Sequence, residues 1–166
     1  MIEVKELHPI HAEELLELRL LGLQEAPEAF SSSFKEEKDK TAEQTAERLL
    51  SSHAKTLGAF SNSVLTGTVT VVKGSKIKTK HKAEIVAVYV CKNKRNQGIG
   101  RKLLEEAVQF AADDPDIEKL YLTVTSRNRA AQNLYQTLGF SDYGKDEKGL
   151  KIDGNYIEEL FMALDL

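Results

Sequence analysis

The sequence has few of the features that mark secreted or membrane proteins. It contains a single cysteine, Cys91, so no intramolecular disulfide can form, which suits a reducing compartment such as the cytoplasm. No apolar run approaches the ~20 residues that a membrane-spanning helix needs. The first residues also lack the apolar segment of a signal peptide. We therefore expect a cytoplasmic protein without a membrane partner.

Strong net charge and metal-ligand spacing are also missing. The net charge is −3, so we expect no general binding to nucleic acid. The four histidines lack metal-ligand spacing with Cys91 or with one another, and we predict no metal site. The chain has 166 residues, of which 41% are hydrophobic, enough for a sizeable core. No repeat, low-complexity segment or linker divides it, so we expect one domain over residues 1–166.

Hydrophobic periodicity and capping residues predict a mixed sheet with helices on its faces. A helix begins near Pro9 and ends near Gln24, and Thr41 with Gln44 forms a capping box that opens a second helix to about Leu50. The other predicted elements are strands at 2–7, 55–61, 64–72, 83–91, 120–125 and 155–164, a short strand or turn that begins at Phe140, helices at 99–112 and 128–138, an exposed connection at 73–82 and a charged loop at 145–154.

The most informative stretch joins a β-branched strand at 84–90 to the helix that begins near Ile99. Gly98 and Gly100 lie at this junction. The first N–H groups of a helix lack internal partners and carry partial positive charge, and glycines let an anion approach them. Residues 85–104 contain no acid, and five basic residues surround the loop: Lys92, Lys94, Arg95, Arg101 and Lys102. The stretch therefore predicts a polyphosphate-binding loop.

Two motifs resemble those of the Gcn5-related N-acetyltransferase (GNAT) family. The stretch Arg95-Asn96-Gln97-Gly98-Ile99-Gly100 fits the family's Arg/Gln-x-x-Gly-x-Gly/Ala loop, whose amides hold the pyrophosphate of acetyl-coenzyme A (acetyl-CoA). Residues 128–140 match every fixed position of the family segment Asn-x-x-Ala-x-x-Leu-Tyr-x-x-x-Gly-Phe. A Walker loop and a complete dinucleotide fingerprint are both missing. The resemblance covers nearly the whole chain and is strongest over residues 84–140.

The resemblance implies a GNAT-like fold of class α/β (α+β), with a mixed, mostly antiparallel central sheet of about six or seven strands and about four flanking helices. It implies an N-acetyltransferase that moves an acetyl group from acetyl-CoA to a primary amine by direct attack in a ternary complex. The backbone at Val88 and Val90 would pair with the pantetheine arm, and one of these amides would polarise the thioester carbonyl. The other implied cofactor residues are Arg95, Asn96, Gln97, Gly98, Ile99, Gly100, Arg101, Asn128 and Asn133.

The resemblance also assigns Tyr135 as the general acid that protonates the departing thiolate. A phenol with a pKa of about 10 is protonated at neutral pH and can donate this proton. Glu84 is the candidate general base, because it is the only acid in its strand. By period-two alternation Glu84 should share a face with Val88. Glu158 and Glu159 are rivals, since one of them faces inward if the last strand is regular.

Several alternatives stay open. Cys91 follows the strand directly and would suit an acetyl-cysteine intermediate, although no neighbouring histidine is evident to activate it. A second alternative is a catalytically inactive acetyl-CoA sensor or interaction module. In a third, residues 73–82 and 92–102 would form a basic face that binds RNA.

The acceptor is the least defined part of this interpretation. It would be a small-molecule amine or a peptide or protein amine, and the protein a monomer or a homodimer. By resemblance, the connection at 25–30 would line the acceptor side, where Glu25 and Glu28 would attract a cationic amine.

Overall fold

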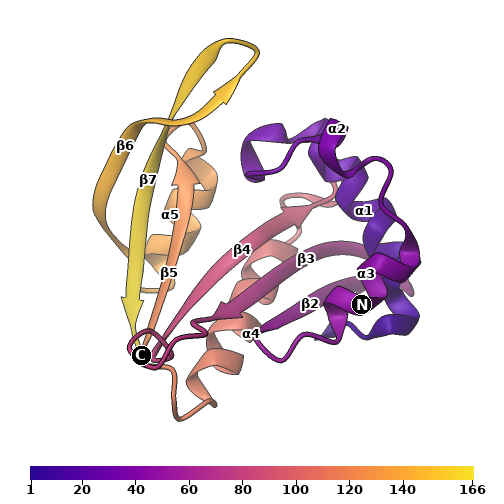
Figure 1. The fold of residues 1–166 in the computed structure, drawn as a ribbon, viewed down its shortest axis with the longest axis horizontal. Helices are drawn as coiled ribbons and strands as arrows, with labels where there is room; N and C mark the ends of the chain where they lie inside the picture. The colour runs from indigo at the N-terminus through magenta and orange to yellow at the C-terminus, as the bar shows by residue number, and fades with distance from the viewer.

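The computed structural model describes residues 1–166 and contains one seven-stranded sheet with helices on both faces (Figure 1). The strands are β1 (Ile2–Glu6), β2 (Ala54–Ser61), β3 (Val64–Lys73), β4 (Lys82–Val90), β5 (Lys119–Thr125), β6 (Ser141–Ile152) and β7 (Asn155–Asp165). The helices are α1 (Ala12–Glu25), α2 (Phe34–Glu37), α3 (Ala42–Leu49), α4 (Ile99–Ala112) and α5 (Arg129–Thr137), with 3₁₀ turns η1 (Pro9–His11), η2 (Pro27–Ala29) and η3 (Lys92–Lys94). The predicted mixed, mostly antiparallel sheet with flanking helices is confirmed. None of the helices has the length and apolar content required to span a bilayer.

The strand order is β1-β2-β3-β4-β5-β7-β6, and β4 and β5 are the only parallel neighbours. Their pairing is short, because only residues 82–84 of β4 pair with residues 119–121 of β5. Past these pairs the two strands diverge, and Figure 1 shows β4 staying beside β3 while β5 stays beside β7. The facing edges of β4 and β5 therefore leave a gap that widens toward the start of α4.

The sheet separates two hydrophobic clusters. On one face α4 buries the side chains that gave it helical spacing in the sequence, together with core residues of β5: Ile99, Leu103, Leu104, Ala107, Ala111, Leu120 and Leu122. On the opposite face α1 and α3 cover Phe60, Leu65 and Tyr89. The two sides of the sheet are therefore the α4 face and the α1/α3 face.

Strand β4 contains a β-bulge that simple alternation did not predict. Thr68 and Thr70 of β3 pair with Tyr89 and Val86 of β4, so β4 carries one residue more than β3 over this span. Ala87 adopts a left-handed φ of 52° at the bulge. Beyond it Val88 packs with the α4 cluster, whereas Glu84 lies before the bulge on the opposite face from Ala83 and Ile85. The prediction that Glu84 and Val88 share a face is therefore wrong, because the extra residue reverses the alternation.

The prediction of a charged loop over residues 145–154 is also wrong. Strand β6 continues to Ile152, and only Asp153 and Gly154 form the turn to β7. The side chains of residues 141–148 are all exposed, so the hydrophobic alternation that identifies a strand is missing. Backbone pairing with β7, interrupted by two bulges, holds this strand instead.

Replacing Ala87 with glycine tests the bulge. A non-glycine residue in the left-handed conformation costs roughly 1–2 kcal/mol. Ala87→Gly removes this cost and loses a half-buried methyl group, so we expect the free energy of unfolding to change by less than about 0.5 kcal/mol. The matched variant Ala83→Gly lies in the regular part of the strand and should lose about 1.5 kcal/mol. Urea denaturation measures both, and equal losses would contradict a left-handed Ala87.

Candidate active site

The loop between β4 and α4 presents a row of unpaired backbone N–H groups. No hydrogen bond within the chain uses the amides from Asn96 to Arg101, and the next amide, that of Lys102, donates to the Gly98 carbonyl at 3.0 Å. Gly98 has a φ of 80°, and a Cβ at this position would meet no atom within 4 Å. Because free amides at a helix N-terminus attract anions, and the space beside Gly98 is open, this loop can hold a polyphosphate.

The side chains of the predicted loop residues hold the loop in place or face outward. Ile99 is 1% exposed and anchors the loop in the α4 cluster. Arg101 donates to the Thr137 hydroxyl at 3.1 Å, which links α4 to α5. The side chains of Asn96 and Gln97 are exposed. An anion at this loop would contact the backbone amides, and exposed polar side chains surround them.

The edge of β4 that faces β5 carries further unpaired groups. The Cys91 amide donates to the Thr66 carbonyl of β3 at 2.9 Å. Successive residues of a strand point their backbone groups to opposite sides, so those of Val90, and by the same alternation those of Val88, point into the gap. Arg95 Nε donates to the Val90 carbonyl at 3.0 Å, which leaves the Val90 amide free. The gap is therefore lined on one side by amides that can bind an added strand.

Tyr135 lies on α5 in the α4 cluster, with its ring edge-on to that of Phe140 at 6.0 Å. The residue is 6% exposed, yet its hydroxyl makes no hydrogen bond within the chain and is not sealed from solvent. Burial raises the pKa of Tyr135 to about 12, so the phenol stays protonated at neutral pH. Its neighbour Leu134 and Val90 of β4 both lie beside Gly100, which places α5 and the end of β4 near the start of α4. Tyr135 is thus a protonated phenol on the α4 face of the sheet.

The two predicted asparagines differ in their surroundings. Asn128 is the N-cap of α5, and its Oδ1 accepts a hydrogen bond from the Ala131 amide at 3.1 Å. Its side-chain amide nitrogen remains free for a ligand. Asn133 is exposed on α5, and its side chain makes no hydrogen bond within the chain.

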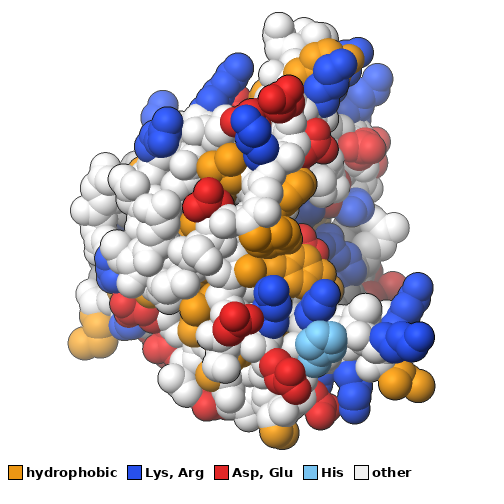
Figure 2. All heavy atoms as spheres, turned by 90° about the vertical axis from the view of Figure 1, so that its left-hand side faces the viewer, with side chains coloured by type: hydrophobic (Ala, Val, Ile, Leu, Met, Phe, Trp, Pro, Cys, Tyr) orange, Lys and Arg blue, Asp and Glu red, His pale blue; other side chains and the backbone are white.

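Glu84 lies on the α1/α3 face, where β4 and β5 are still paired and Tyr121 is its partner. It lines a cavity of about 570 Å³ together with Tyr121, Tyr143 and Lys82. Figure 2 faces the β6/β7 side of the molecule and shows hydrophobic side chains at its centre, with Lys and Arg side chains beside them. Glu84 has no ion-pair or hydrogen-bond partner, and burial raises the pKa of its carboxyl group above the usual value. A carboxylate in this state is a suitable proton acceptor.

The rival acids of β7 lie on opposite faces. Glu159 pairs with Thr125 and lies on the same face as Glu84, and burial, reinforced by Asp146, raises the pKa of its carboxyl group. Glu158 is one residue earlier and therefore faces the other way, with its carboxylate 3.7 Å from Lys145 Nζ. The structure thus keeps Glu84 and Glu159 as candidates on the α1/α3 face. Their partners on β5, Tyr121 and Thr125, are four residues apart, so the two acids are separated by roughly 13 Å along the strand direction.

The structure also bears on the cysteine nucleophile and on metal binding. Burial, with a contribution from Glu25, raises the pKa of the Cys91 thiol, which opposes formation of the thiolate that a nucleophile requires. No group of three or more His, Cys, Asp or Glu side chains is placed to hold a metal ion.

Sequence reasoning missed a contact across the gap on the α1/α3 face. Arg127, which follows β5, lies 3.5 Å from the Glu28 carboxylate of η2. The other acid of this connection, Glu25, accepts a hydrogen bond from the Tyr89 hydroxyl. Both acids that were expected to attract a cationic amine therefore already have partners. Glu28 and Arg127 are 99 residues apart, and no sequence signal joins them.

Comparisons with known proteins agree with this geometry. A model of the Acetyltransferase (GNAT) family matches residues 20–140, and the chain belongs to this family. The chain superposes on a GNAT-family acetyltransferase from Streptococcus pneumoniae with a TM-score of 0.90 and 29% identity, and 100% of each chain is covered. The resemblance inferred from the two motifs is thereby confirmed.

Two more distant structures share the fold. The yncA protein of Salmonella typhimurium, solved with its cofactor acetyl-CoA, has a TM-score of 0.86 and 18% identity over 99% of this chain and 93% of its own. The ribosomal-protein-alanine N-acetyltransferase of Brucella melitensis has a TM-score of 0.85 and 21% identity over 99% of each chain.

Glu84→Gln tests the burial of this carboxylate independently of any activity. The folded-state pKa is raised above the unfolded value, so ionisation of Glu84 lowers stability at neutral pH, and this cost vanishes below a pH of about 4, where the group is protonated in both states. We expect Glu84→Gln to raise the melting temperature at pH 7, with a smaller difference at pH 4. Glu3→Gln removes the same charge from an exposed position and should change neither value. A variant less stable than the wild type at pH 7 would refute this.

Proposed function

We propose that residues 1–166 act as one acetyl-CoA-dependent N-acetyltransferase domain that acetylates a primary amine. The observation that carries the proposal is the combination of three features: the free amides from Asn96 to Arg101, the backbone edge at Val88 and Val90, and the protonated Tyr135 on the adjoining helix α5. Membership of the GNAT family and the acetyl-CoA bound by the Salmonella relative support this choice of co-substrate. The single free thiol favours a reducing, cytoplasmic location.

The residues around the gap suit the parts of acetyl-CoA. The pyrophosphate would lie on the amides that follow Arg95, where the basic loop and the N-terminus of α4 favour negative charge. The pantetheine arm would pair with Val88 and Val90 as an added strand, and Asn128 and Asn133 would donate hydrogen bonds from α5. Acetyl-CoA supplies the acyl group in activated form, as a thioester.

The chemistry follows from which groups lie on which side of β4. The acceptor amine approaches from the α1/α3 face, its nitrogen bonds to the thioester carbon, and the carbon–sulfur bond breaks in a ternary complex. The amide of Val88 or Val90 stabilises the carbonyl oxygen as it gains negative charge. Tyr135 gives its proton to the departing sulfur, and Glu84 accepts the proton of the amine through water. Positioning two substrates in one cleft supplies much of the acceleration.

Gly98→Glu tests the cofactor loop. Acetyl-CoA at 100 times its dissociation constant adds about 2.7 kcal/mol to the stability of the wild type, which raises the melting temperature by roughly 5–11 °C for a domain of this size. The glutamate carboxylate would lie where the pyrophosphate belongs, so we expect the variant to lose this rise. Gly98→Ala is the matched control, since it introduces the same left-handed strain without the charge and should retain part of the rise. A wild-type melt unchanged by saturating acetyl-CoA would count against the proposal.

Tyr135→Phe separates an enzyme from a sensor of acetyl-CoA. The hydroxyl has no partner within the chain, so its removal leaves no group unsatisfied. The variant should therefore fold and keep the rise in melting temperature with acetyl-CoA. Loss of a general acid should lower the rate of thiol release from acetyl-CoA, with a panel of amines, by about 100-fold or more. In the same assay, whichever of Glu84→Gln and Glu159→Gln loses rate identifies the base. An undiminished rate in Tyr135→Phe would remove this residue from the mechanism.

A further inference from the structure

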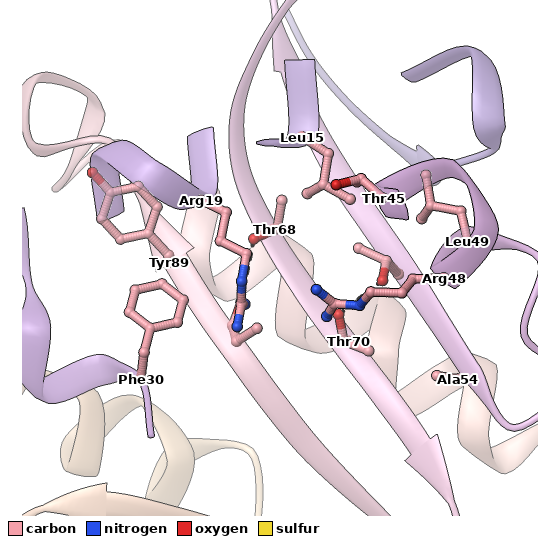
Figure 3. A pocket seen from close by; sticks show the side chains of 12 residues that line it. Leu15, Arg19, Phe30, Thr45, Arg48, Leu49, Ala54, Thr68, Thr70 and Tyr89 are labelled. Atoms are coloured by element: carbon pink, nitrogen blue, oxygen red, sulfur yellow. Dashed lines mark hydrogen bonds between the residues drawn. The ribbon is translucent and has the colours of Figure 1, made fainter. Parts of the chain in front are cut away.

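A second, smaller cavity lies on the α1/α3 face of the sheet, between helices α1 and α3 and strands β2 to β4 (Figure 3). Its volume is about 70 Å³, far below the 300–1,000 Å³ of a pocket that encloses a whole ligand. Two arginines and a set of threonines line it, among them Arg19, Arg48, Thr45, Thr56 and Thr70. The cavity is therefore suited to one small polar group rather than to an entire substrate.

Arg19 is fixed with most of its donors unused. Its Nε donates to both carboxylate oxygens of Glu37 at 2.9 Å, and Glu37 is 2% exposed. Its Nη1 and Nη2 make no hydrogen bond within the chain and are not sealed from solvent. Figure 3 shows the guanidinium groups of Arg19 and Arg48 directed into the same space. The buried glutamate thus holds a guanidinium group whose outer edge is free to bind a ligand.

The cations around this cavity outnumber the carboxylates. Arg19, Lys40 and Arg48 all pair with the same acid, Glu37. Its carboxylate lies 2.8 Å from Lys40 Nζ and 3.9 Å from Arg48 Nη1. Three positive groups on one carboxylate leave a positive excess beside the cavity. Thr45 adds a hydroxyl that has no partner within the chain, although the residue is 6% exposed. Free guanidinium donors, a hydroxyl and excess positive charge together favour an anion.

The cavity adjoins the proposed reaction centre. Ala87 and Tyr89 of β4 form part of its wall, and Ala87 is the bulge residue next to Val88, whose backbone faces the cofactor gap. The cavity also lies on the same face of β4 as Glu84, the face from which the amine must approach. An acceptor with its anionic group in this cavity would therefore have its amine directed toward the bulge of β4.

We propose that this cavity binds the carboxylate of the acceptor, so that the substrate is a small amine that also carries a carboxylate group. The planar guanidinium of Arg19 can donate two parallel hydrogen bonds to a carboxylate. Arg48 and Thr45 would donate the other hydrogen bonds to this carboxylate. This inference rests on the proposed N-acetyltransferase function, because it names the substrate class of the same site.

The test compares ω-amino carboxylates, from glycine to 6-aminohexanoate, with the alkylamines that lack only the carboxylate. Binding is measured by calorimetry with coenzyme A present, and KM by thiol release. We expect at least one carboxylated amine to bind about tenfold or more tightly than its matched alkylamine, as a charge-assisted hydrogen bond would give. Equal affinity within every pair overturns the inference.

Three variants locate the effect. Arg48→Ala should abolish the preference while the fold persists, because the Arg48 side chain is 57% exposed and only 3.9 Å from Glu37. Arg19→Lys keeps a cation beside Glu37 but removes the bidentate donor, so it should also reduce the preference for carboxylated amines. Lys78→Ala removes a charge from the exposed connection and should leave it unchanged. A preference that survives in both arginine variants places the carboxylate elsewhere and overturns the assignment.

The inference and the proposed function fail in different ways. Acetylation of amines without any preference for a carboxylate keeps the function and rejects the inference. Absence of thiol release with every amine, together with an unchanged acetyl-CoA melt, rejects the function, whereas calorimetry still decides whether the cavity binds carboxylates.

Discussion

The short pairing between β4 and β5 is the constraint on which the site depends. These strands pair with each other only over residues 82–84 of β4 and 119–121 of β5. Beyond these pairs β4 stays paired with β3, and β5 with β7. A strand edge inside a protein leaves backbone groups that need partners. The gap therefore supplies hydrogen-bonding groups at Val88 and Val90, and the N-terminus of α4 closes one end of it with further free amides. An extended, phosphorylated ligand, as proposed above, would satisfy both sets of groups.

The bulge at Ala87 turns the side chains of Glu84 and Val88 to opposite faces of the sheet. Before the bulge, Glu84 faces the side covered by α1 and α3, whereas Val88 beyond it packs with the α4 cluster. The left-handed residue between them forms part of the wall of the small cationic cavity. The proposed base and the proposed carboxylate pocket thus lie on one face, and Tyr135 lies on the other. The amine and the departing thiol would be served by separate proton carriers.

The contiguous motifs of the sequence predicted their local structure well, because short-range physics decides it. The helix that begins at Ile99 and the capping box at Thr41 depend on hydrogen bonds between residues three or four positions apart. The same rule would have found α2, since Ser33 and Glu36 form a capping box that the sequence analysis overlooked.

Sequence alone determined the family, the glycine-containing loop before α4 and the buried faces of α4 and α5, because these follow from short motifs and from helical spacing. Only the tertiary structure decided the bulge of β4, the long exposed strand β6 and the cluster of Arg19, Lys40 and Arg48 around Glu37. A bulge arises from the register between two strands, and β6 is held by backbone pairing with β7 rather than by its side chains. Glu37 looks like an ordinary surface acid in a charged run, and becomes a buried anchor only because α1, α2 and α3 pack together around it.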